Sequence, residues 1–162
     1  MTATLTPLPD RAGTESVTTT LSLVHDQWME RIARLLAPVT LPRATFWERW
    51  GAVRFLSDQF EDRFRLEAEL VESLADLLPP SARARIVGAR AALERTRDEL
   101  MEAGRRRGTG AQVALLARRF LDHARRWCAT LELATTGIVA EDLPGTSRDL
   151  LARLRTVAGL DL

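Results

Sequence analysis

The sequence predicts an all-α protein: an up-down-up-down four-helix bundle with a short fifth helix at its C-terminus. Apolar residues recur at the helical period of 3.6 over four long stretches. No stretch alternates apolar and polar residues as a β-strand does, and glycine and proline fall between the stretches rather than inside them. Long helices with short connections favour neighbours that run antiparallel in a bundle.

The first two helices have clear ends. The first is expected from Thr18 to just before Pro38. The second opens at a capping box formed by Thr45 and Glu48. It runs about nine turns to Pro79–Pro80. Its expected apolar stripe consists of Phe46, Trp50, Val53, Leu56, Phe60, Phe64, Leu70, Val71, Leu74 and Leu77.

The remaining helices follow the same logic. Ser81 is expected to cap a third helix that carries Ile86 and Leu93, and Gly104–Gly110 is a loop. A fourth helix then bears Val113, Leu116, Phe120, Trp127 and Leu131. After Pro144–Gly145, Ser147 is expected to cap a short amphipathic helix that packs outside the bundle.

Length and charge limit the function classes. The 162 residues fit one domain, which we assign to residues 16–162, after a flexible leader over residues 1–15. The net charge is +1 and all 23 basic residues are arginine, so a nucleic-acid partner and every lysine-based chemistry are not expected. No apolar run reaches the ~20 residues that span a bilayer, and no secretory signal is recognisable, so we expect no membrane partner and a cytoplasmic location.

Three polar residues interrupt the apolar stripes. Glu67 has apolar residues at offsets of −7, −3, +3, +4 and +7, which points its carboxylate at the bundle centre. His25 and His123, the two histidines of the chain, stand on the inner stripes of the first and fourth helices. A Glu and two His from three helices can hold a single iron or zinc ion.

An ion pair is the alternative for Glu67, because a buried carboxylate needs a cationic partner or a metal. Arg63 lies four residues earlier, which is the spacing of a helical ion pair. Arg90 and Arg97 stand on the inner stripe of the third helix. A buried pair of Glu67 with Arg63 and Arg90 would take the place of a metal.

Three segments carry a resemblance to a known family. "LVHDQWMERIARLL", "FLSDQFEDRFRLEAELVESL" and "FLDHARRWCATLE" resemble the first, second and fourth helices of hemerythrin-like (HHE cation-binding) proteins. The resemblance implies a four-helix bundle whose helices supply a di-iron centre. It matches His25, Glu67 and His123 to three of the ligands.

The other ligand positions of the resemblance are changed. Arg63 stands where the second helix would carry its histidine, and Trp127 where the fourth would carry its carboxylate. The third-helix histidine is missing around Ala89–Arg90. The resemblance therefore implies a degenerate site without a di-iron cofactor.

No catalytic spacing is recognisable, so we expect a protein that is not an enzyme. The first hypothesis is a binding, interaction or regulatory module for an unknown protein partner or small ligand. The second is a metal or small-ligand protein that uses His25, Glu67 and His123. The third is an oligomer, such as a homodimer, with Trp47 exposed at its interface. Cys128 is expected to be a half-buried inert thiol, and Arg105–Arg107 a solvated loop.

Overall fold

The structure, a computed structural model, describes residues 16–106 and 109–160; the expected leader over residues 1–15 lies outside them. No strand forms within these ranges, where the only β-type pairing is one bridge between Ser16 and Val139. The prediction of an all-α protein is confirmed. The described helices are α1 (Val17–Leu36), α2 (Phe46–Phe55), α3 (Glu61–Ser73), α4 (Pro80–Arg105), α5 (Gly110–Ala134) and α6 (Gly145–Ala158).

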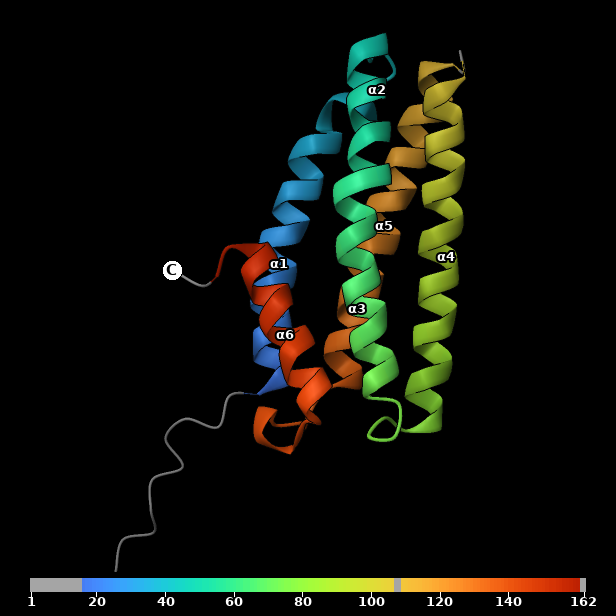
Figure 1. The fold of residues 1–162 in the computed structure, drawn as a ribbon. Helices are drawn as coiled ribbons and strands as arrows, with labels where there is room; N and C mark the ends of the chain where they lie inside the picture. The colour runs from blue at the N-terminus through green and yellow to red at the C-terminus, as the bar shows by residue number, and fades with distance from the viewer. Residues whose placement is uncertain (1–15, 107–108, 161–162) are drawn as a thin grey trace, which may run out of the picture.

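The long helices lie side by side lengthwise (Figure 1). Helices α2 and α3 form one nearly continuous rod, because a π-helical turn, Leu56–Phe60, joins them. Helix α5 packs against both α4 and α1, and α6 packs against α3 and α1. Helix α6 therefore covers one side of α1 and α3. None of the described helices is long and apolar enough to cross a membrane.

Aromatic rings fill the centre between these helices. Trp28 of α1 lies 5.7 Å from Phe55 and 6.3 Å from Phe60, measured between ring centroids. Phe60 also meets Phe120 of α5 at 5.0 Å in an edge-to-face arrangement. Such contacts add to the gain from apolar burial. They tie α1, the α2–α3 rod and α5 into one core.

The start of the second helix is confirmed, but its expected stripe is partly wrong. The Thr45 side chain accepts a hydrogen bond from the Glu48 backbone, and Glu48 bonds back, as a capping box requires. However, Phe46 is 61% exposed and Trp50 is 47% exposed. Val53 and Leu56 of the same stripe are 4% and 0% exposed, so the expected stripe holds next to the π-helical turn and fails only in the N-terminal half of α2.

The C-terminal end of that helix also differs from the expectation. Helix α3 ends at Ser73, before the two prolines, and turns follow it. Leu77, expected on the inner stripe, is 45% exposed as a result. Leu74 and Leu78 are buried and cover the bottom of the core.

Two expected caps are also wrong. Helix α4 begins at Pro80, without a side-chain cap, because proline at the first position is already set to the helical φ angle. Ser81 is the next residue and is exposed. Ser147 lies inside α6 and is fully buried, where its hydroxyl meets that of Ser73 at 2.7 Å. It joins α6 to α3 instead of starting a helix.

Candidate functional site

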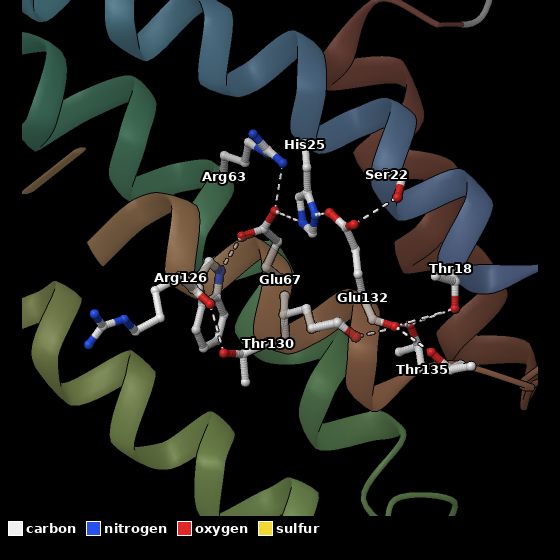
Figure 2. A network of polar contacts seen from close by, with 12 residues as sticks. Thr18, Ser22, His25, Arg63, Glu67, Arg126, Thr130, Glu132 and Thr135 are labelled. Atoms are coloured by element: carbon white, nitrogen blue, oxygen red, sulfur yellow. Dashed lines mark hydrogen bonds and ion pairs between the residues drawn. The ribbon is translucent and has the colours of Figure 1, made fainter. Parts of the chain in front are cut away.

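A buried charged cluster lies where α1, α3 and α5 meet (Figure 2). Helix α1 contributes His25, α3 contributes Arg63 and Glu67, and α5 contributes Trp127 and Glu132. The expected burial of Glu67 is confirmed, since its exposed fraction is 2%. We call these five residues the interior cluster.

Glu67 is the centre of the interior cluster. Its Oε1 accepts a hydrogen bond of 2.6 Å from Nη2 of Arg63. Its Oε2 accepts one of 2.7 Å from the indole Nε1 of Trp127. Trp127, which stands where the resemblance would place a carboxylate, is therefore a hydrogen-bond donor. Both carboxylate oxygens have an N–H partner from the protein itself.

His25 lies between two carboxylates. Its Nδ1 is 2.6 Å from Oε1 of Glu132, and its Nε2 is 3.3 Å from Oε1 of Glu67. The Ser22 hydroxyl donates a 2.8 Å hydrogen bond to the other oxygen of Glu132, which orients that carboxylate. A doubly protonated imidazole can donate from both nitrogens, whereas a neutral one can donate from only one. Nε2 makes no hydrogen bond, but the charges of the two nearby carboxylates favour the imidazolium form of His25.

The electrostatics of the cluster follow from these contacts. Burial alone would raise the pKa of Glu67, but the charge of Arg63 and the contacts of His25 and Trp127 outweigh it and lower this pKa to about 2. Burial alone would lower the pKa of His25, but the contact and charge of Glu67 and the bond to Glu132 raise it above its usual value. With His25 protonated, two cations and two anions balance to a net charge of zero.

Arg63 is fully enclosed and only partly paired. Its exposed fraction is 1%, and its guanidinium carbon lies 4.5 Å from the ring centroid of Trp28. Burial lowers the pKa of Arg63, and the charge of Glu67 only partly offsets this decrease. Nη2 bonds Glu67, but Nε and Nη1 are buried and have no hydrogen-bond partner. Two strong donors of Arg63 are thus unused.

His123 does not lie with His25 and Glu67. Its Nδ1 is 2.8 Å from the hydroxyl of Thr96 and 3.1 Å from the carbonyl of Ala92, both on α4. The stripe that carries His123 faces α4 at this level, because α5 packs against α4 as well as α1. The three suggested metal ligands are therefore not brought together.

Arg90 and Arg97 also lie away from Glu67. Arg90 pairs with Glu94 at 2.9 Å and with Glu72 at 3.6 Å, and its side chain is 40% exposed. Arg97 pairs with Glu61 and Asp98. Both arginines find surface carboxylates at the edge of α4. Of the suggested ion pair, only Arg63 and Glu67 meet.

The interior cluster does not fit a di-iron centre. A guanidinium and an indole N–H are donors, and neither can ligate a cation. His25 directs its two nitrogens at two different carboxylates. Within the described residues, no three His, Cys, Asp or Glu side chains are grouped so that they could hold a metal ion.

Two members of this network were missed by sequence reasoning. Glu132 ends the third quoted segment, but its pairing with His25 spans 107 residues and depends on how α1 meets α5. Ser22 was missed for the same reason, because its hydroxyl donates to Glu132. The available signal was position: Glu132 stands four residues after Cys128, which is buried on the same helix. Burial also raises the pKa of the Cys128 thiol, in agreement with an inert thiol.

Comparison of the chain with protein-family models, with curated proteins and with solved structures gives no match.

Proposed function

We propose that this protein is a hemerythrin-like helical bundle in which the interior cluster has taken the place of a metal centre. The bundle has up-down-up-down topology, with α6 as its fifth helix. The protein acts as a binding or regulatory module for a protein partner or a small ligand and catalyses no reaction. The observation that carries the proposal is the 2.6 Å bond from Arg63 to Glu67, at the spacing where the resemblance would place a histidine and a carboxylate.

The chemistry of the cluster supports a structural role. A buried carboxylate is costly to leave alone, and either a cation or a set of hydrogen bonds can offset that cost. Arg63 and Trp127 donate to both oxygens of Glu67, and His25 adds a second charge. A permanent cation beside the carboxylate also repels a metal ion. The same bundle interior can therefore be held without a cofactor.

The surface supports the binding role. Four large apolar side chains that lie within ten residues of one another are strongly exposed, and exposed apolar groups of this size often mark interaction sites. They are Leu41, Phe46, Trp47 and Trp50, with Trp47 at 76% exposure. The exposure of Trp47 supports the oligomer hypothesis. We extend the proposal to a protein partner, which can be a second copy, at this patch.

Metal analysis of the purified full chain tests the proposal. Protein from iron-rich and zinc-supplemented cultures should contain well under one metal per chain and show no oxo-bridged charge-transfer absorption. Helicity measured by circular dichroism should survive exhaustive chelation, because folding that needs a metal is lost when the metal is removed. Two tightly held irons per chain, or helicity that returns only with added metal, would contradict the proposal.

A further inference from the structure

A cavity of about 330 Å³ opens next to the interior cluster, between α1, α3 and the end of α6. Its walls include Trp28, Arg31 and Arg34 of α1, Arg63 of α3, and Val157 of α6. We call it the arginine cavity. Its volume is at the lower end of the range of small-molecule sites. Three guanidinium groups line it, against one carboxylate, that of Glu30.

Arg63 gives the arginine cavity an unused set of donors. The N–H groups of Nε and Nη1 are buried without a partner, although a buried donor that is left unsatisfied is destabilising. Glu67 fixes the guanidinium from the other side, and Trp28 stacks against its face. The donors are thus held in place before any ligand arrives. An anion that enters the cavity would satisfy them.

Arg31 and Arg34 form the mouth of the arginine cavity. Both are exposed and hold surface partners: Arg31 donates to Gln59 at 2.6 Å, and Arg34 pairs with Glu30 at 2.5 Å. Exposed pairs of this kind contribute little free energy, so an anion can replace them. The Arg63 nitrogens are closed to water in the structure, and a shift of these long side chains would open a path to them.

A second cavity extends the positive surface. It has a volume of about 430 Å³ and lies on the other side of Arg31 and Arg34, toward α2. Arg54 lines it together with Phe55 and Asp58, whose carboxylate lies 3.8 Å from Nε of Arg54. The full chain has a net charge of only +1, so the arginines on these two walls are a local feature.

We propose that the arginine cavity binds a small anion through a phosphate or carboxylate group, with Arg63 at its floor and Arg31 and Arg34 at its mouth. Guanidinium groups bind both anion types with charge-assisted hydrogen bonds. This inference names the class of ligand that the proposed binding module takes. It rests on the proposed function, because it requires that Arg63, and not a metal, occupies the interior.

The test is a titration of the full chain, treated with chelator and shown to be free of metal, with inorganic phosphate and in a second series with succinate. Ionic strength is held constant with sodium chloride. Nuclear magnetic resonance follows the Nε–Hε signal of Arg63 and the indole signal of Trp28. Both signals should shift and saturate with at least one anion. Saturation with phosphate alone assigns a phosphate-bearing ligand, and saturation with succinate alone assigns a carboxylate.

Matched variants locate the site. Arg31→Gln and Arg34→Gln should each weaken binding about tenfold, the loss expected for one charge-assisted hydrogen bond. Arg125→Gln removes an exposed arginine of α5 that pairs with Asp122 outside the cavity, and binding should stay unchanged. Signals that move no further than in sodium chloride, or equal losses in all three variants, would overturn the inference. Metal that resists chelation would instead contradict the proposed function, before any titration begins.

Discussion

Arg63 and Glu67 lie one helical turn apart on α3 and meet across 2.6 Å in the interior of the protein. Their side chains are 1% and 3% exposed. Removing one member of a buried pair leaves the other as an uncompensated charge, which costs far more than the pair itself contributes. Substitutions at these two positions should therefore have large effects, which depend on what is left behind.

Glu67→Ala should lower the free energy of unfolding by about 3–5 kcal/mol, because it strands the buried guanidinium of Arg63. Glu67→Gln should cost less, because the amide oxygen still accepts a hydrogen bond. Urea denaturation followed by circular dichroism measures both. Glu69→Ala, an exposed glutamate on the same helix, is the matched control and should stay within about 0.5 kcal/mol of the wild type. Equal losses at the two positions would contradict the account.

Trp127→Phe should cost about 1–3 kcal/mol, because it keeps a ring in place but removes the N–H group that bonds Oε2 of Glu67. Trp47→Phe is the matched control, because it makes the same substitution at a residue that is 76% exposed. It should leave the free energy of unfolding nearly unchanged. Denaturant titrations of the two variants side by side give the comparison. If Trp127→Phe were as mild as Trp47→Phe, Trp127 would be only a packing residue.

Stability should be greatest between about pH 4.5 and 6.5. Glu67 has a pKa of about 2 in the folded protein, against an ordinary 4.5, so its contribution of about 3 kcal/mol is present above pH 4.5 and is lost as the pH falls toward 2. The pKa of His25 is raised above 6.5, so its contribution is present below pH 6.5 and is lost as the pH rises past the folded pKa. Urea midpoints measured from pH 2 to 9 test both limbs.

Histidine variants test whether His25 causes the loss of stability above pH 6.5. His25→Gln should abolish the decline of stability above pH 6.5, whereas His123→Gln should retain it, because His123 bonds Thr96 and not a carboxylate. Stability that rises steadily from pH 6.5 to 9 in the wild type would show that His25 is not held as an imidazolium.

Glu132→Ala should lower the pKa of His25, because it removes the 2.6 Å bond to Nδ1 that favours the charged ring. Proton NMR of the histidine ring protons measures this pKa directly. A His25 pKa that does not move would mean that Glu67 alone sets it.

The sequence was informative where the determinants are local. The offsets around Glu67 predict its burial, and the four-residue spacing predicts Arg63 as a partner, because both relations lie within one helix. The capping box at Thr45 is local in the same way. Periodicity also predicted the helical class, since each long stripe spans several turns.

The rest depends on packing between helices. Glu132 meets His25 only because α1 and α5 pack at that level, and no pattern within either segment encodes the pairing. His123 sits on an inner stripe, as its offsets indicate, but α5 packs against both α4 and α1, and His123 faces α4. The π-helical turn between α2 and α3 was equally unpredictable, because one extra residue leaves no mark in composition.

A double-mutant cycle on Arg63 and Glu67, measured in chelated protein, tests the central claim most directly. The variants are Arg63→Met, Glu67→Met and the double substitution, which replaces the pair by two apolar side chains. We predict that each single variant loses about 3–5 kcal/mol and that the double variant loses at least about 2 kcal/mol less than the sum, because no charge is then stranded. Losses that simply add would contradict the claim that this ion pair holds the interior.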